Sequence, residues 1–351
     1  MDLLPLLFAA PDPDGHGQPP ADVAAWQALG SQLGLEGLVP ALADAGLLAV
    51  TPEQRVQAEQ PRLAAEMEQA WIRACAEEAL AALRQADIAV APLKGPLLAA
   101  RIYPRPLVRR STDVDLLVPP AQLDAALTVL AALDYTLPDT RETAHHLRHH
   151  HHVILARPAS PPLELHWAPL HALGTRIEAA DLLQPDGQLE PHAELVYLAA
   201  HAASHDFERP LWLIDLAAFV RAHPQLEPAR LDTLARRWHL TRAWRQAQQM
   251  LAALLGPHAL PWPVPRPDLQ DALVARGQRA YMRLPRKTAT RFAVHIACLV
   301  GRCDNPWRAA WLGQFAALRA VGDLAERRGL PVPPGWPPLP PFPPTAGKSR
   351  P

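Results

Sequence analysis

The chain has 351 residues, which is enough for a sizeable core and for two domains. Hydrophobic residues make up 49% of the sequence and charged residues 20%, as is usual in soluble globular proteins. The 34 basic residues nearly balance the 35 acidic ones, so no overall electric field draws the chain to nucleic acid or to an anionic membrane.

The first part of the chain is predicted to be helical. From residue 22 to about 84, apolar residues recur at spacings of three and four, as on one face of a helix. Thr51 followed by Pro52 indicates a helix start, with Thr51 as the N-cap and Pro52 in the first helical position. We therefore expect an N-terminal helical region over residues 1–84.

Shorter elements of mixed type follow. In chain order they are a strand at 88–93, a helix at 96–102, a loop at 103–112, a strand at 113–118, a helix at 121–133 and strands at 135–137, 153–157 and 162–167. The last of these alternates between polar and apolar residues, so Glu164 and His166 share one face of it. The pattern predicts an α+β fold with a small mixed sheet.

The rest of the chain returns to a helical pattern. The predicted helices are 193–204, 210–221, 228–238, 241–255, 268–284, 286–301 and 306–328. A proline-dense tail over 331–351 is expected to be extended or disordered.

Two aspartates at the start of the 113–118 strand suggest a metal site. Asp113 and Asp115 are two positions apart, so both carboxylates lie on one face of the strand. Mg²⁺ is commonly held by one or two carboxylates together with the phosphate oxygens of a substrate. A simple turn pair is the alternative, but two like charges beside apolar residues are costly without a cation. The pair therefore favours metal-dependent chemistry on a nucleoside triphosphate (NTP).

Basic residues near this strand could complete a phosphate site. Lys94 supplies a point charge, Gly95 permits close approach of the backbone, and a helix start follows at Pro96. Arg109 and Arg110 suit bidentate contacts to phosphate. For Arg110, a solvated loop pair is an equal alternative.

Histidines are unusually concentrated between residues 145 and 152. This tract could bind metal, but strand and loop geometry is expected to scatter the rings. We prefer one or two rings facing an acceptor pocket, with a polar loop as the alternative. His166 could bind metal, hydrogen-bond Glu164 or be an ordinary core histidine.

A second histidine pair lies in the helical half. His201 and His205 are one helical turn apart, but Ala202 occupies the position where a zinc protease needs Glu. The pair is expected to orient carboxylates or to pack against the catalytic core. Asp215 follows an apolar run and needs a partner if buried, for which His201 and His205 are the candidates.

The ordered set of motifs over about 88–220 resembles the nucleotidyltransferase superfamily, with its polymerase-beta-like catalytic core. The closer resemblance is to a bacterial family of uncharacterised nucleotidyltransferases. The matching motifs are Leu93-Lys94-Gly95, Tyr103-Pro104, Arg109, Asp113-Val114-Asp115-Leu116-Leu117-Val118, Glu164-Leu165-His166-Trp167, His201-Ala202-Ala203-Ser204-His205 and Trp212-Leu213-Ile214-Asp215.

The resemblance implies roles for the acidic residues. Asp113 and Asp115 would bind the metal that bridges the triphosphate, and Glu164 would complete a second-metal site that activates an acceptor hydroxyl. A strand carboxylate paired with a neighbour such as Arg157 is the alternative for Glu164. Lys94 and Gly95 stand where most nucleotidyltransferases have a Gly-Ser turn. The implied domains are a catalytic core over 85–170 and a C-terminal helical domain over 190–328.

The predicted activity is transfer of a nucleotidyl group from an NTP such as ATP, with Mg²⁺ or Mn²⁺, to a hydroxyl or phosphate of an unknown acceptor. That acceptor could be a small molecule, a peptide or a protein, whereas the balanced charge disfavours nucleic acid. The alternatives are a nucleotide-binding pseudo-enzyme acting as a regulatory or assembly subunit, and a phosphotransferase or toxin-like modifier of RNA or protein.

The sequence also gives an expected location. The three cysteines lack metal or disulfide spacing, and the N-terminus lacks the basic region of a signal peptide. No run approaches the roughly 20 apolar residues of a membrane span. We therefore expect a cytoplasmic protein without a membrane partner.

Overall fold

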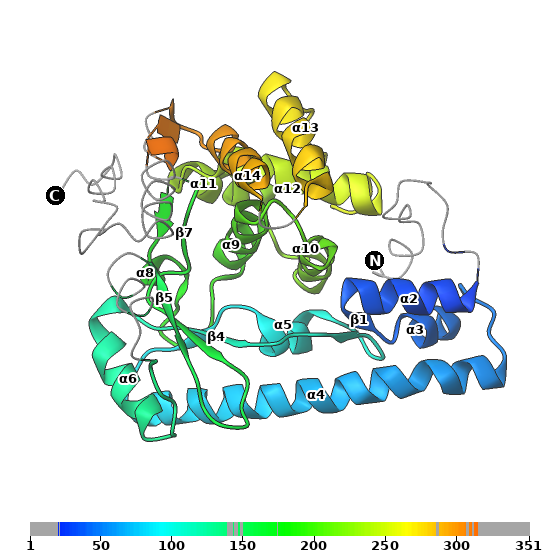
Figure 1. Ribbon diagram of the computed structural model, residues 1–351, viewed down its shortest axis with the longest axis horizontal. Coiled ribbons are helices and arrows are strands. Elements are labelled where there is room, and N and C mark those ends of the chain that lie inside the picture. The colour runs from blue at the N-terminus through cyan, green and yellow to red at the C-terminus, as the bar shows by residue number, and fades with distance from the viewer. Residues whose placement is uncertain are drawn as a thin grey trace.

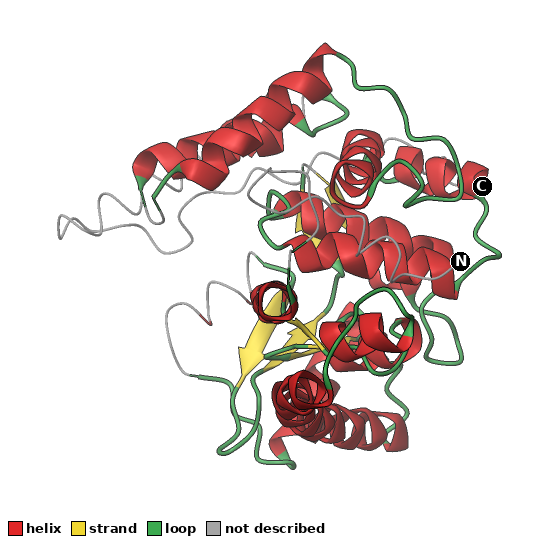
Figure 2. Cartoon of the chain, turned by 90° about the vertical axis from the view of Figure 1, so that its right-hand side faces the viewer, coloured by secondary structure: helices red, strands yellow, loops and turns green. Residues whose placement is uncertain are grey.

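A four-stranded sheet with helices on both faces forms the centre of the protein (Figure 1). The computed structural model describes residues 20, 22–138, 143, 147, 150–173, 175–285, 288–306, 309–310 and 312–314. Figure 2 shows the strands between the long helix at the base and the layer of shorter helices above. The predicted α+β class is confirmed.

The described part of the N-terminal region contains α2 (Val23–Leu33), β1 (Leu35–Glu36), α3 (Leu38–Asp44) and α4 (Pro52–Gln85). The predicted start of α4 is confirmed. Thr51 accepts a hydrogen bond from the backbone of Gln54 at 3.2 Å, and the Gln54 side chain accepts one from the backbone of Thr51 at 2.9 Å. With 34 residues, α4 extends about 50 Å along the base of the molecule (Figure 1).

The central sheet has the strand order β2-β4-β6-β5. Its strands are β2 (Ala91–Pro92), β4 (Val114–Leu117), β5 (His152–Leu155) and β6 (Leu163–His166). β4 and β6 are parallel, whereas β2 and β5 are antiparallel to their neighbours. The register sets Asp115 opposite Glu164 and sets His166 opposite His152. Residues directly opposite share a face, so these side chains lie on one side of the sheet.

The remaining short elements surround this sheet. They are α5 (Gly95–Ile102), β3 (Val108–Arg109), α6 (Leu123–Ala131), β7 (Leu170–Ala172), β8 (Thr175–Ile177) and α8 (Ala179–Leu182). β1 pairs with β3, and β7 pairs with β8. The sequence did not predict these four strands, because two or three residues are too few for a recognisable alternation. The strand predicted at 135–137 forms only a bridge between Thr136 and Ala156.

Side chains of the sheet divide between two hydrophobic cores. Val114 and Leu116 of β4 and Leu165 of β6 pack in a core with α4 and α6. Leu117 belongs instead to the larger core that contains α5, α9 (Pro191–Ser204) and α10 (Pro210–Ala222). Asp115 is two positions from Leu117 and therefore lies on the face turned to α5 and α9. The polar face of the sheet is thus covered by helices from both halves of the chain.

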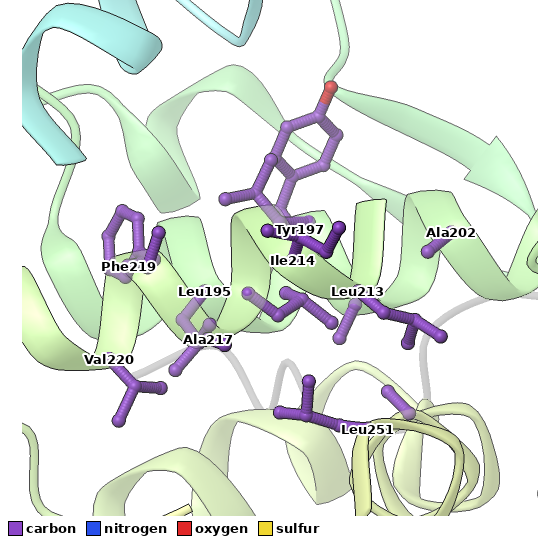
Figure 3. Packing of buried hydrophobic residues seen from close by; sticks show 14 of the residues in the cluster. Leu195, Tyr197, Ala202, Leu213, Ile214, Ala217, Phe219, Val220 and Leu251 are labelled. Atoms are coloured by element: carbon purple, nitrogen blue, oxygen red, sulfur yellow. The ribbon is translucent and has the colours of Figure 1, made fainter. Parts of the chain in front are cut away.

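Of the C-terminal helices, α10 and the next two pack against α9, and the last two pack against each other. The helices after α10 are α11 (Pro228–Arg237), α12 (Thr241–Leu255), α13 (Leu269–Arg283) and α14 (Ala289–Gly301). Figure 3 shows Leu195 of α9, Ala217 of α10 and Leu251 of α12 meeting in this core. All six helices predicted between 193 and 301 are confirmed, with ends shifted by up to three residues.

Most of the predicted 306–328 helix and all of the 331–351 tail lie outside the described residues. None of the helices that the structure describes combines the length and the apolar character needed to cross a membrane.

Candidate metal and nucleotide site

Asp115 is the centre of a cluster of charged groups on the covered face of the sheet. It is only 2% exposed. Its Oδ1 lies 2.9 Å from Nζ of Lys94 and 3.0 Å from Nε2 of His166, whereas its Oδ2 is buried without a hydrogen-bond partner. Burial alone would raise the pKa of Asp115, but Lys94 and His166 outweigh it and hold that pKa far below its usual value. Asp115 is therefore ionised with one oxygen still available.

Glu164 reaches the cluster from the neighbouring parallel strand. Its Oε2 lies 3.4 Å from Nε2 of His166. One ligand atom from each of Asp115, Glu164 and His166 can be chosen so that all lie within 4.8 Å of one another. The predicted shared face of Glu164 and His166 is confirmed. The alternative pairing of Glu164 with Arg157 is wrong, because Arg157 instead pairs with Glu78 at 2.7 Å.

Asp113 lies just before β4 at the edge of this group. It is partly buried and is not among the three residues whose ligand atoms lie within 4.8 Å. Burial and the negative charge of Asp115 raise the pKa of Asp113, against the opposing effect of Lys94. Asp113 therefore carries an unfavourable charge that a bound cation would relieve.

Lys94 and Gly95 form a turn that leads into α5. Gly95 has φ +77°, and a Cβ there would lie 3.3 Å from Oγ of Ser111, so the position favours glycine. Burial alone would lower the pKa of Lys94, but the carboxylate of Asp115 raises it above its usual value. The ammonium group stays charged at the start of an eight-residue helix, where backbone N–H groups also favour anions.

Arg109 and Asp215 form a buried ion pair, which corrects the prediction made for Asp215. Nη2 of Arg109 lies 2.9 Å from Oδ2 of Asp215, and Tyr103 donates a hydrogen bond to Oδ1 of Asp215 at 2.7 Å. The predicted partners of Asp215, His201 and His205, are therefore wrong. Arg109 is 8% exposed and also donates to Oγ of Ser111 at 2.8 Å.

The Arg109 guanidinium donates hydrogen bonds to Asp215, to Ser111 and to the carbonyl of Arg110, and its contact with phosphate stays a prediction. Arg109 belongs to β3, whose pairing with β1 was not predicted, and its side chain reaches Asp215 of α10. Arg110 pairs with Glu68 of α4 at 2.9 Å, with both side chains exposed. This geometry matches the solvated alternative for Arg110.

Helix α9 adds aromatic and imidazole side chains to the site. His201 and His205 have ring centroids 4.9 Å apart, and both contact the ring of Trp212. Burial lowers the pKa of His201 well below its usual value, and the charge of Lys94 adds to this effect. These ring contacts lie within the helical half of the chain, so the packing of the pair against the catalytic core stays a prediction.

Tyr197 is a residue that the sequence did not single out. Its ring projects from α9 away from Leu251, and its hydroxyl is buried without a hydrogen-bond partner (Figure 3). Burial raises the pKa of Tyr197, and the charges of Lys94 and Asp115 also act on it. The sequence feature that could have indicated Tyr197 is its position four residues before His201, which places both side chains on one face of the helix.

Part of the histidine tract lies next to the site. The side chains of His151 and His152 converge with that of His166, whereas an acceptor pocket beside them stays a prediction. His145, His146 and His149 lie outside the described residues.

A small mixed sheet that gathers carboxylates from two adjacent strands beside a Lys-Gly turn is an arrangement suited to nucleotidyl transfer. Residues 19–256 match the family described as "Uncharacterised nucleotidyltransferase", and the match covers more than half of the chain. The chain therefore belongs to this family, and the predicted membership is confirmed. No curated protein and no solved structure matches the chain. Membership supports an enzyme of the nucleotidyltransferase kind.

Proposed function

We propose that the protein is a metal-dependent nucleotidyltransferase that moves a nucleotidyl group from an NTP to a hydroxyl or phosphate of an acceptor. The buried, unpartnered Oδ2 of Asp115 carries this proposal. Nearly all buried polar groups in proteins have a partner, so an ionised oxygen without one indicates a missing ligand. Its neighbours Glu164 and His166 offer further ligand atoms within 4.8 Å.

The donor set fits Mg²⁺ or Mn²⁺. Asp113, Asp115 and Glu164 supply the carboxylate oxygens that both ions accept. When bound, such an ion would stabilise negative charge on the phosphates and lower the pKa of an acceptor hydroxyl.

The chain's own groups support binding of a triphosphate. Lys94 and the first backbone N–H groups of α5 present positive charge beside Asp115. His166 orients Asp115 through a 3.0 Å hydrogen bond. Lys94 would exchange part of its contact with Asp115 for a phosphate oxygen, since an ammonium group has three donors.

Transfer of label from NTPs tests the proposal. The full chain is incubated with α-labelled NTPs and Mg²⁺ or Mn²⁺ over a panel of small molecules, peptides and proteins, including the chain itself. We expect label on at least one acceptor, and none after chelation of the metal. In Glu164→Gln, transfer should fall about 10²–10⁴-fold, as after loss of a catalytic base. Transfer within about threefold of wild type in this variant would contradict the role of Glu164.

One observation favours the pseudo-enzyme as a second candidate. Lys94 already neutralises Asp115 at 2.9 Å, as a bound cation would. A chain that binds Mg²⁺-ATP by calorimetry but labels no acceptor, itself included, would support this candidate over the transferase. Binding of neither metal nor nucleotide would contradict both.

A further inference from the structure

A group of imidazoles lies beside the carboxylate cluster on the same face of the sheet. His152 of β5 is directly opposite His166 of β6, and their ring centroids are 4.8 Å apart. His151 adds a third ring, 4.8 Å from His152 and 5.6 Å from His166. One ring nitrogen from each can be chosen so that all three lie within 4.8 Å of one another.

The backbone holds these histidines in place. His152 and His166 belong to hydrogen-bonded strands, so their Cα positions are fixed by the ladder. The carbonyl of His151 accepts a hydrogen bond from the backbone of Trp167 at 2.9 Å, which ties the third residue to the end of β6. The cluster is therefore built by sheet pairing.

His166 has a ring nitrogen available for a ligand of its own. Its Nε2 faces Asp115 at 3.0 Å, whereas its Nδ1 is buried without a hydrogen-bond partner. The residue is 3% exposed, so solvent does not satisfy that nitrogen. A buried imidazole nitrogen rarely lacks a partner, and here the rings of His151 and His152 lie next to that of His166, so this nitrogen is a candidate metal ligand.

We propose that His151, His152 and His166 form a site for a divalent transition-metal ion of the Zn²⁺ class, which adjoins the carboxylate site and shares His166 with it. Imidazole nitrogens suit Zn²⁺ and Co²⁺, whereas Mg²⁺ requires oxygen ligands. Three protein ligands leave one tetrahedral position open, as in zinc sites that bind an external ligand. The proposal does not rest on nucleotidyl transfer, because it concerns a different ion and different ligands apart from His166.

Titration of Co²⁺ tests the site, because tetrahedral Co²⁺ has strong visible absorption and replaces Zn²⁺. The full chain is prepared without an affinity tag and is freed of metal by chelation. We expect one equivalent of Co²⁺ to give a tetrahedral spectrum that Zn²⁺ abolishes and Mg²⁺ leaves unchanged. His151→Ala and His152→Ala should each weaken Co²⁺ binding by about tenfold or more, as expected when a metal site loses a ligand. The exposed His258 is the matched control, and His258→Ala should bind Co²⁺ as wild type does.

One further variant and a check of folding keep the test decisive. His152→Gln retains a polar side chain of similar size in β5, and circular dichroism shows whether each variant is folded. A folded His151 or His152 variant with wild-type Co²⁺ affinity would overturn the proposal. So would a wild type without the tetrahedral spectrum, or a spectrum lost only on replacing His145, His146 and His149. Nucleotide transfer is not measured, so failure of the transferase function leaves this result unaffected.

Discussion

Asp115 and Asp113 carry the same charge in adjacent environments, yet their substitution should affect stability in opposite directions. Asp115 is paired with Lys94 at 2.9 Å, whereas Asp113 has a pKa raised by burial and by Asp115. Removal of the Asp115 charge leaves a largely buried ammonium group without its partner. Removal of the Asp113 charge relieves repulsion.

We therefore expect Asp115→Asn to lower the free energy of unfolding by about 3 kcal/mol, as when one partner of a buried pair is lost. Asp113→Asn should leave it unchanged or raise it. Calorimetric titration with Mg²⁺-ATP should show loss of nucleotide binding in both variants. Urea unfolding measures the stability difference. Wild-type nucleotide affinity in both would contradict the metal site, and equal stability losses would contradict the assigned pairing.

Tyr197 offers a test of which groups face the substrate. Its buried hydroxyl has no partner, so Tyr197→Phe should leave the free energy of unfolding unchanged or raise it by about 1–3 kcal/mol. If the hydroxyl contacts the nucleotide or the acceptor, turnover should fall in spite of the retained stability. Tyr135→Phe is the matched control, because Tyr135 is also buried but belongs to the core beside α4. An equal effect of both substitutions on turnover would exclude a special role for Tyr197.

At the scale of elements, the sequence predicted the helices and strands that have a regular spacing of apolar residues. The long helices were found from their apolar spacing, and the start of α4 was found from Thr51 and Pro52. The common face of Glu164 and His166 was predicted because strand alternation is local. The contact of Lys94 with Asp115 depends on the pairing of β2 with β4, which has no local pattern.

The ion pair of Arg109 and Asp215 joins β3 to α10, and it was missed for the same reason. A two-residue strand such as β3 has no period, so the direction of Arg109 could not be predicted. The family motifs contain both residues but do not say that they meet. Their contact unites the two halves of the chain, because Asp215 follows Arg109 by 106 residues.

We expect Asp215→Asn to lower the free energy of unfolding by about 3–5 kcal/mol, because the buried guanidinium of Arg109 loses its partner. Nucleotide affinity of the remaining folded protein should be unchanged, since Arg109 faces Asp215 and Ser111. Glu68→Gln breaks the exposed pair with Arg110 and should cost less than about 1 kcal/mol. Denaturant unfolding measures both. A small loss in Asp215→Asn would contradict the buried pair.

At the scale of the whole molecule, α9 covers the polar face of the sheet. The fold shifts the pKa of a histidine on α9 and that of a histidine on the sheet in opposite directions. Burial lowers the pKa of His201 on α9. Burial would also lower the pKa of His166 on β6, but its hydrogen bonds to Asp115 and Glu164 raise it. His166 therefore stabilises the fold below its unfolded pKa of about 6.5, and this contribution is lost as pH rises through its folded pKa.

His201 has the opposite linkage. The unfolded chain binds a proton at His201 near pH 6.5, whereas the folded chain does so only at much lower pH. Stability due to His201 is therefore complete above about pH 6.5 and is lost progressively as pH falls below it. We expect the unfolding temperature of wild type to fall more between pH 7.5 and about 5.5 than that of His201→Phe. His258→Ala, which changes an exposed histidine, should follow wild type. Parallel curves for wild type and His201→Phe would show that His201 is not held neutral between the sheet and the helical layer.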